Sequence, residues 1–137
     1  MDRAALLTTV ENAFAARVRG DAEAAAAYFA PGATFRFAGE QSLARAYLGD
    51  GSEYSLESAV GRIIELVEMT ARETIDALVD GNRCGLLSRA TVSFGGREPF
   101  ETTLFHIFEL DDQGRIASVL EFADTARIGR ELVALAG

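Results

Sequence analysis

The chain has 137 residues, enough for one domain that buries roughly two-thirds of its unfolded surface without a disulfide or a metal. Its formal net charge is −8, and its 13 basic residues are all arginines scattered along the sequence, which argues against nucleic acid and anionic membranes as partners. No apolar run reaches the roughly 18 residues of a spanning helix, and the N-terminus lacks the uninterrupted apolar region of a secretory leader, so we expect a cytoplasmic protein.

The first third of the chain has the pattern of two helices followed by a strand. Asp21 begins the second helix, which contains the alanines 24–27 and ends before Pro31-Gly32, because proline and glycine do not continue a helix. Residues 34–37 then have the composition of a strand. The first helix is predicted by apolar residues that recur every four positions before Gly20: Leu6, Val10, Phe14 and Val18.

Residues 38–54 are interpreted as a flap over the mouth of a pocket. Residues 42–48 suit a short helical piece, and residues 49–52 have the small polar side chains of a loop. Tyr47 and Tyr54 in this flap are candidates to offer hydroxyl groups to a ligand, and exposed residues without a role are an equal alternative. Ser55 is a candidate N-cap for a third helix, which carries an apolar stripe: Leu56, Val60, Ile63, Ile64 and Val67.

The second half of the chain has the pattern of an antiparallel sheet followed by a terminal helix. Glycine-containing turns separate its segments, and Asp111-Asp112 suits a hairpin turn better than a magnesium site. A helical pattern follows over residues 128–135. The predicted strands lie at 73–79, 83–94, 100–110 and 115–124.

Both faces of the long strand at 100–110 carry bulky apolar side chains. One face contains Leu104, His106 and Phe108, and the other contains Phe105 and Ile107. One face can cover the helices and a pocket, whereas an apolar second face in a domain of this size needs another cover. We therefore expect a homodimer that forms through the outer face of the sheet.

This order of elements resembles the nuclear-transport-factor-2-like (NTF2-like) superfamily, which includes SnoaL-like polyketide cyclases, limonene-epoxide hydrolases and ketosteroid isomerases. The resemblance implies a single SnoaL-like domain over residues 1–137 with an α+β fold. In that fold a curved antiparallel β-sheet wraps around three N-terminal helices in a cone-shaped, cystatin-like arrangement, and a C-terminal helix follows. The segments that carry the resemblance are 19–23, 28–35, 80–83, 108–116 and 121–125.

The catalytic patterns of the active families are only partly present. Phe37 and Phe105 stand where ketosteroid isomerases place a carboxylate base and an oxyanion-holding acid, and neither phenylalanine can exchange a proton, so an isomerase of that design is not expected. Of the limonene-epoxide hydrolase pattern, Arg89 and Asp124 match, while Thr91, Phe35 and Phe37 replace the other members. The SnoaL-like cyclases use an acid near the end of the sheet, for which Asp124 is the nearest candidate.

The candidate catalytic residues are therefore Asp124, Arg89 and Glu121. Asp124 with Arg89 can form a charge pair at the pocket mouth, and Glu121 interrupts an apolar strand, which suits an acid catalyst if the residue is buried. Each has a simpler alternative. Asp124 directly precedes the terminal helix as an N-cap, Arg89 faces solvent or a dimer partner, and Glu121 lies exposed at a sheet edge.

A mostly apolar set of side chains is expected to line the pocket. The resemblance places Phe105 toward the pocket, so we expect His106 on the opposite face as a core or interface histidine, with catalysis as the alternative. Cys84 is expected to be a small core residue, and neither a metal nor another cofactor is expected. The predicted pocket residues are Phe14, Tyr28, Phe35, Phe37, Met69, Thr91, Ser93, Thr103, Phe105, Ile107, Val119 and Phe122.

The sequence thus predicts a protein that holds a small apolar molecule in an aromatic pocket. A cofactor-free cyclase, isomerase or hydratase activity through Asp124 with Arg89 is an extension of this hypothesis. The alternative is a non-catalytic binding or dimerisation module with the same fold.

Overall fold

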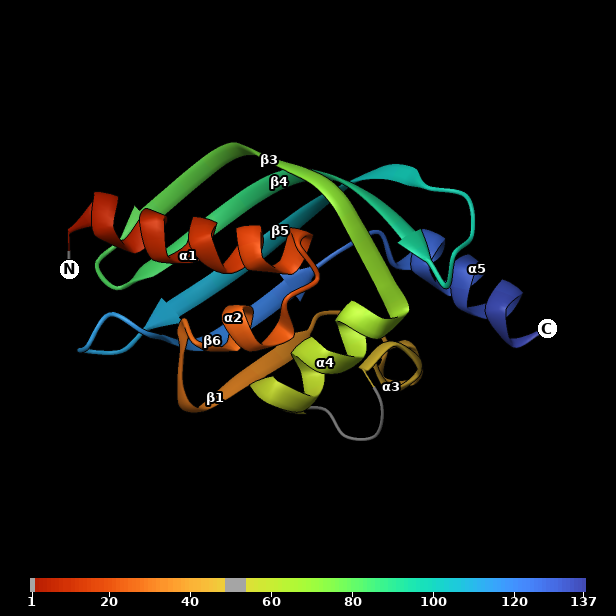
Figure 1. The fold of residues 1–137 in the computed structure, drawn as a ribbon, viewed down its shortest axis with the longest axis horizontal. Coiled ribbons are helices and arrows are strands. Elements are labelled where there is room, and N and C mark those ends of the chain that lie inside the picture. The colour runs from red at the N-terminus through yellow and green to blue at the C-terminus, as the bar shows by residue number, and fades with distance from the viewer. Residues whose placement is uncertain (1, 49–53) are drawn as a thin grey trace.

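The computed structural model describes residues 2–48 and 54–137, and the side chains of residues 41, 47, 48 and 54–59 lie outside that description. Five helices and one mixed sheet of six strands make up the described part of the chain (Figure 1). The helices are α1 (Arg3–Val18), α2 (Ala22–Ala26), α3 (Gln41–Leu48), α4 (Leu56–Leu66) and α5 (Thr125–Ala136). The strands are β1 (Phe29–Phe37), β2 (Tyr54–Ser55), β3 (Val67–Asp80), β4 (Arg83–Phe94), β5 (Phe100–Leu110) and β6 (Ile116–Phe122).

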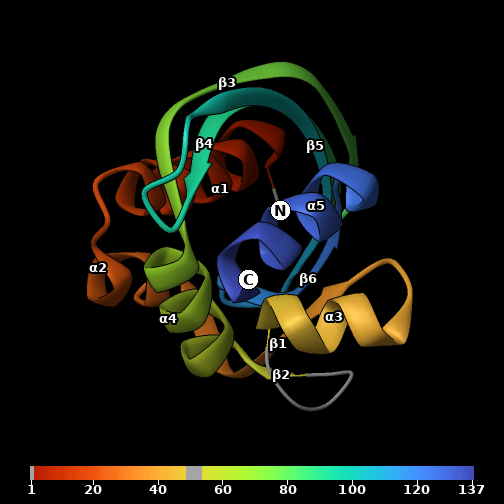
Figure 2. The same ribbon diagram turned by 90° about the vertical axis from the view of Figure 1, so that its right-hand side faces the viewer.

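The strands are ordered β2-β1-β6-β5-β4-β3 across the sheet. Neighbouring strands run antiparallel, except that β1 and β6 pair in parallel. Register shifts interrupt β3 between Met69 and Ala71 and between Thr74 and Asp76, and such irregularities bend a strand. Figure 2 shows the resulting curvature, in which β3, β4 and β5 arch across the top of the molecule. The predicted α+β fold with a curved sheet is confirmed.

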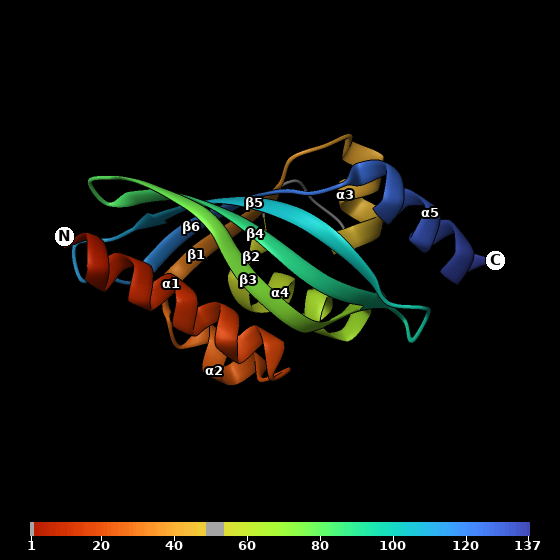
Figure 3. The same cartoon turned by 90° about the horizontal axis from the view of Figure 1, so that it is seen from above.

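The helices occupy two regions around the sheet. Figure 3 shows α1, α2 and α4 together on one side of the sheet, while α3 and α5 lie near its opposite end. The apolar stripe of α1 faces inward, with Leu6 and Val10 fully buried, and the helix ends where Gly20 adopts a left-handed conformation (φ 73°). The short helical piece predicted within the flap forms α3.

Two of the hairpin turns in the sheet are held by side-chain hydrogen bonds. Gly81, with φ 61°, occupies the β3–β4 turn, and the side-chain amide of Asn82 donates to the carbonyl of Leu110 (2.8 Å). At the β5–β6 turn, the backbone N–H groups of Arg115 and Gln113 donate to the Asp111 carboxylate and hold the pKa of that group below its usual range. Asp111 is therefore a turn residue, as predicted.

Burial alternates along the two central strands and identifies the inner face of the sheet. Even-numbered residues are buried in β4 and, from Leu104 onward, in β5, while their odd-numbered neighbours other than Ser93 are half-buried or exposed. The inner face packs on the helices and forms the core with Ile116, Val119 and Ile128. In the described residues, no helix has the length and apolar character needed to cross a membrane.

Candidate functional site

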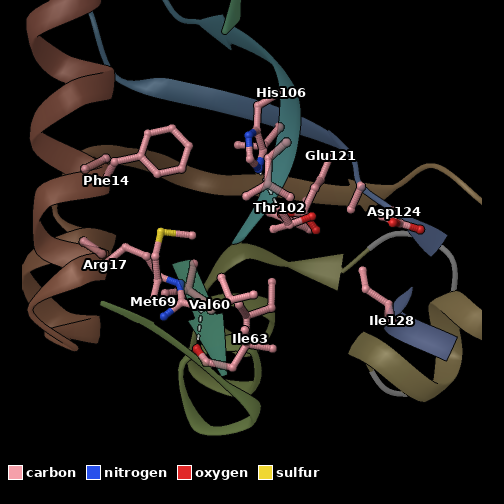
Figure 4. Close-up of a pocket in the computed structure, with 18 of the residues that line it drawn as sticks. Phe14, Arg17, Val60, Ile63, Met69, Thr102, His106, Glu121, Asp124 and Ile128 are labelled. Atoms are coloured by element: carbon pink, nitrogen blue, oxygen red, sulfur yellow. Dashed lines mark hydrogen bonds and ion pairs between the residues drawn. The ribbon is translucent and has the colours of Figure 1, made fainter. Parts of the chain in front are cut away.

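A cavity lies between the inner face of the sheet and helices α1, α4 and α5 (Figure 4). Its volume, measured as the space that the centre of a water molecule can occupy, is about 100 Å³. An apolar protein cavity of about 150 Å³ can hold benzene, so this smaller space accepts at most a small molecule and not a large polycyclic one. Phenylalanines from α1 and three strands supply much of its wall: Phe14, Phe29, Phe35, Phe94, Phe100 and Phe108.

Few polar side chains interrupt this apolar wall. Among the described lining residues, those with polar groups are Arg17, Thr102, His106, Glu121 and Asp124. Figure 4 shows His106 and Glu121 next to each other, opposite a wall that contains Met69, Val60 and Ile63. A mostly apolar cavity with a few convergent polar groups is the usual form of a ligand-binding site.

His106 and Glu121 form a buried pair across two neighbouring strands. They are directly opposite each other in the β5–β6 register, on the inner face, and His106 Nε2 lies 2.9 Å from Glu121 Oε1. Their side chains are 4% and 8% exposed. The edge of the pair is held by Phe14, whose ring makes a T-shaped contact with the imidazole at a centroid distance of 5.1 Å.

Each member of this pair has a second polar atom without a partner. His106 Nδ1 and Glu121 Oε2 are buried and make no hydrogen bond within the described residues. Buried polar groups are nearly always hydrogen-bonded, since leaving one unpaired costs about 1–3 kcal/mol. An unpaired carboxylate oxygen in an apolar cavity is able to accept a proton or a hydrogen bond from a bound molecule.

Arg72 supports the wall behind His106 without lining the cavity itself. Its guanidinium lies over the Phe14 ring at 3.8 Å, donates to Glu11 Oε2 at 2.8 Å and also donates to the hydroxyl of Ser88. These contacts join α1 to β3 and β4 and fix the position of Phe14. Arg17, one turn further along α1, lines the cavity and donates to the carbonyl of Val67 at 2.5 Å.

Asp124 combines the two roles that the sequence left open. Its carboxylate accepts from the backbone N–H of Arg127 at 3.0 Å and so caps α5, and the residue also lines the cavity. The residue is exposed, which places it at the mouth rather than in the interior. The two acids of the cavity thus have different environments: Glu121 is enclosed, whereas Asp124 meets solvent.

The predicted partnership of Arg89 with Asp124 is not present. Arg89 belongs to the outer face of β4, its side chain is 47% exposed, and it does not line the cavity. It forms ion pairs with Glu73 at 2.7 Å and with Glu101 at 3.5 Å, both of which lie on neighbouring strands. The simpler alternative for Arg89, an outward-facing residue, describes its position.

The prediction that Phe105 lines the pocket is wrong, because Phe105 lies on the outer face of the sheet. The predicted pocket residues on the same face are wrong for the same reason. The outer face of β5 carries Thr103, Phe105 and Ile107, and Thr91 lies on the outer face of β4. The Phe105 ring lies on Gly85, where an added Cβ would meet the ring at 2.7 Å. The physical reason is that alternation divides a strand into two faces but does not say which one meets the helices when both are apolar.

The remaining predicted pocket residues divide between the cavity and other sites. Phe14, Phe35, Met69 and Val119 line the cavity as predicted. Tyr28, Phe37, Ser93 and Phe122 do not line it: Tyr28 packs beside the core, Phe37 is buried near the start of α5, the Ser93 hydroxyl donates to Arg97, and Phe122 lies on the outer face beside Phe105. The side chains of Tyr47 and Tyr54 lie outside the described residues.

Sequence reasoning assigned His106 to the wrong face and missed Arg17, Thr102, Phe100 and Leu104 as lining residues. One signal was available for the pair. His106 and Glu121 stand at positions that a β5–β6 hairpin with a turn at residues 111–115 can bring opposite each other.

Cys84 is a buried core residue, as predicted, and burial raises the pKa of its thiol to about 11. In the described residues, no group of three or more His, Cys, Asp or Glu side chains is arranged to hold a metal.

No family model matches the sequence, and no curated protein sequence matches it. Solved structures do match it over nearly their full lengths. An NTF2-like protein from Burkholderia xenovorans is 22% identical with a TM-score of 0.73, and the match covers 96% of this chain and 98% of that one. A second NTF2-like protein, from Burkholderia pseudomallei, is 18% identical with a TM-score of 0.77 over the same shares.

The chain has the NTF2-like fold. A further structure with this similarity is a limonene-epoxide-hydrolase-like epoxide hydrolase from Mycobacterium tuberculosis, which is 16% identical with a TM-score of 0.69. That match covers 96% of this chain and 91% of the hydrolase. One of the solved structures similar to this chain is therefore an enzyme. The fold alone does not determine an activity.

Proposed function

We propose that this NTF2-like protein binds a small, mainly apolar molecule and catalyses a proton transfer on it without a cofactor. The observation that carries the proposal is the buried His106–Glu121 pair, in which Glu121 Oε2 has no partner among the described residues and the surrounding wall is apolar. Glu121 is the proposed catalytic base. Arg89 and Asp124 do not act as a catalytic pair in this proposal, because they lie on different faces.

The geometry supports a specific division of roles. In its ionised form, Glu121 removes a proton from a carbon next to a substrate carbonyl, and the C–H electron pair becomes the π bond of the enol or enolate. His106 Nε2–H, which donates to Oε1, orients the carboxylate. Return of the proton to another carbon of the substrate completes an isomerisation. In a cyclisation, the enolate carbon instead attacks a second carbonyl carbon of the same substrate, the π pair of that carbonyl moves to its oxygen, and the proton returns to the resulting alkoxide. The apolar wall strengthens these electrostatic interactions because it excludes water.

Deuterium exchange tests this proposal without knowledge of the natural substrate. Small ketones such as acetophenone and cyclohexanone are incubated with the protein in D₂O, and loss of the α-proton signal is followed by NMR. We expect protein-dependent exchange that falls by about 100-fold or more in Glu121→Gln, because the amide is not a base. His106→Gln, which keeps a donor near Oε1, is expected to lower the rate less.

The matched control is Glu101→Gln, which removes a carboxylate from the exposed outer face of β5 and leaves the cavity unchanged. This variant is expected to exchange at the wild-type rate. Equal rates in the wild type and Glu121→Gln would remove Glu121 from the proposed role.

A binding protein without turnover is the second candidate function. It is favoured by one observation: Asp124, the acid that the cyclase resemblance suggested, serves as the N-cap of α5, and Arg89 lies on the other face of the sheet. Under this alternative the cavity still binds ligand, and no ketone exchanges faster with the protein than with buffer.

We also propose that the protein is a homodimer that forms through the outer face of the sheet. Half-buried or exposed apolar side chains gather there, and Arg89, Glu73 and Glu101 form a charged border. An apolar centre with a polar rim is the usual composition of a protein interface. The central residues are Leu87, Phe105, Ile107, Leu120 and Phe122, which pair across β4, β5 and β6.

A further inference from the structure

We infer that Glu121 selects neutral single-ring ligands that carry a hydroxyl group, such as simple phenols. This inference rests on the ligand-binding part of the proposed function: a phenol would occupy the Glu121 carboxylate as a competing ligand and not as a substrate, because it has no C–H next to a carbonyl group. It begins from the oxygen that the His106 bond leaves unused: Glu121 lines the cavity, and its Oε2 atom is buried and has no partner among the described residues. Since the side chain is only 8% exposed, bulk solvent does not satisfy that atom.

The shared hydrogen bond determines what Oε2 needs. His106 Nε2 and Glu121 Oε1 are 2.9 Å apart and hold one proton between them. With the carboxylate ionised, Oε2 is an acceptor whether the imidazole is neutral or protonated, because every carboxylate oxygen then has only lone pairs to offer. A ligand that satisfies this atom must therefore donate a hydrogen bond, as a hydroxyl does and as an ether or a simple carbonyl does not.

The shape of the cavity limits the rest of the ligand. Its volume of about 100 Å³ is below the roughly 150 Å³ of an apolar cavity that holds benzene, so a single ring requires only a modest adjustment of the walls. The walls that face this space are aromatic, with Phe14, Phe94 and Phe108 among them. Such side chains pack edge-to-face or offset against a planar ring.

The charges in the cavity disfavour an anionic ligand near Glu121. A carboxylate-bearing ligand placed there would meet the carboxylate of Glu121 in an apolar, water-poor space, and Asp124 adds a second negative charge at the mouth. Arg17 is the cationic group among the described lining residues, and it donates to the carbonyl of Val67. The competing possibility, that Arg17 binds an anion, is one arm of the experiment.

The test compares ligands of nearly equal shape against the intact protein. Dissociation constants of phenol, anisole, toluene and benzoate are measured by calorimetry or by ligand-detected NMR. Phenol is expected to bind at least about tenfold more tightly than anisole, which has the same ring but no donor, since an unmet buried acceptor costs about 1–3 kcal/mol. In Glu121→Gln, the affinity for phenol relative to that for anisole is expected to fall. In Glu101→Gln, this relative affinity is expected to stay unchanged.

The single histidine of the chain supplies a second measurement that needs no variant. Nitrogen-15 NMR of the imidazole reports His106 alone, and phenol is expected to shift its Nε2 resonance more than anisole does at equal occupancy. Equal effects of the two ligands, or equal affinities, would overturn the inference and indicate that water satisfies Oε2. Tighter binding of benzoate than of phenol would overturn it in favour of Arg17.

The outcome is separable from that of the exchange experiment. Selective binding of phenol without ketone exchange would support the inference about recognition and contradict the proposed catalysis. Ketone exchange that depends on Glu121, together with equal binding of phenol and anisole, would support the proposed catalysis and contradict the inference about recognition.

Discussion

Glu121 occupies a position where a carboxylate is energetically unfavourable. It is enclosed by apolar side chains, Oε1 shares a hydrogen bond with His106, and Oε2 is unpaired among the described residues. Burial of an ionised group costs several kcal/mol unless hydrogen bonds or opposite charges compensate. A residue that weakens the fold while it faces a cavity is more readily explained by function than by stability. The same logic separates Glu121 from Arg89, whose ion pairs are exposed to solvent.

Cys84 illustrates burial without a functional role. The residue is 2% exposed, and burial raises the pKa of its thiol from 9.0 to about 11. We expect iodoacetamide to modify the native protein far more slowly at pH 8 than the denatured protein, because the thiolate is the reactive form. Protection should weaken as the pH approaches 11. As the chain has a single cysteine, the mass of the intact protein measures the reaction directly.

The same shift has a consequence for stability. A raised pKa in the folded state means that the protonated thiol stabilises the fold, fully below pH 9 and progressively less as the pH rises through about 11. Between pH 9 and 11, the free energy of unfolding of Cys84→Ser should therefore fall less than that of the wild type. Equal alkylation of the native and denatured protein at pH 8 would show that the thiol is not enclosed.

At the scale of elements, the sequence predicts that the long strands form, and their bounds and orientation less well: β3 begins at Val67, which the sequence pattern assigns to the preceding helix, and β1 begins at Phe29 instead of residue 34. The apolar stripe of α1, the glycine turn at residues 80–82 and the long strand β5 are at the predicted places. The face of β5 that meets the helices was assigned incorrectly, because Phe105 and Ile107 on one side are as apolar as Leu104 and Phe108 on the other. Alternation shows which residues of a strand share a face, and only tertiary packing decides which of the two faces meets the helices.

The site was therefore predicted in part. Phe14, Phe35, Met69 and Val119 depended on helices and strands whose inner faces are clear in the sequence, and they line the cavity. The His106–Glu121 contact depends on the β5–β6 register, which the length and geometry of the turn at Asp111 determine. Two residues that are 15 positions apart have no local pattern that marks them as partners.

Helix α5 closes one end of the cavity through a charged cluster. Glu131 is buried, and its Oε1 lies 3.3 Å from Arg97 Nε while its Oε2 lies 3.7 Å from Arg127 Nε. The Arg127 guanidinium also covers the ring of Phe100, with 3.7 Å between its Cζ and the ring centroid. Phe100 lines the cavity, so this cluster connects α5 to the wall. The position of the helix therefore affects the shape of the binding space.

We expect Glu131→Gln to destabilise the protein by about 1 kcal/mol, since both arginines are partly exposed and recover hydration when the charge is removed. Thermal unfolding should show a melting temperature lower by about 3–5 °C. Hydrogen exchange should accelerate in α5 more than in α1. Arg130→Gln, an exposed change on the same helix, serves as the control and should leave both measurements unchanged. Uniform acceleration in all helices would contradict this local role.

At the scale of the whole molecule, the outer face of the sheet is the surface through which we propose that the dimer forms. Phe122 is 41% exposed and lies 6.1 Å from Phe105, measured between ring centroids. Large contiguous apolar surfaces on soluble proteins usually mark an interaction site. The net charge of −8 repels approaching copies in general, so a stable dimer needs an apolar contact of this kind.

Analytical ultracentrifugation tests the dimer. We expect the wild type to sediment as a dimer at micromolar concentration and Phe122→Glu to sediment as a monomer, because the substitution places a charge at the centre of the interface. Val133→Glu is the matched control, as it adds the same charge at an apolar residue that is 74% exposed and belongs to α5 and not to the sheet. A monomeric wild type, or a dimeric Phe122→Glu, would contradict the proposal.

The parallel pairing of β1 with β6 has a consequence for biosynthesis. As the ribosome releases the chain, β1 emerges before β3, β4 and β5, yet its long hydrogen-bonding neighbour β6 emerges after them, and among the described strands only the two-residue β2 can pair with β1 until then. Glu121, Asp124 and Ile128 belong to the same late segment. The nascent polypeptide thus completes both its sheet and the lining of its cavity only after β6 has emerged.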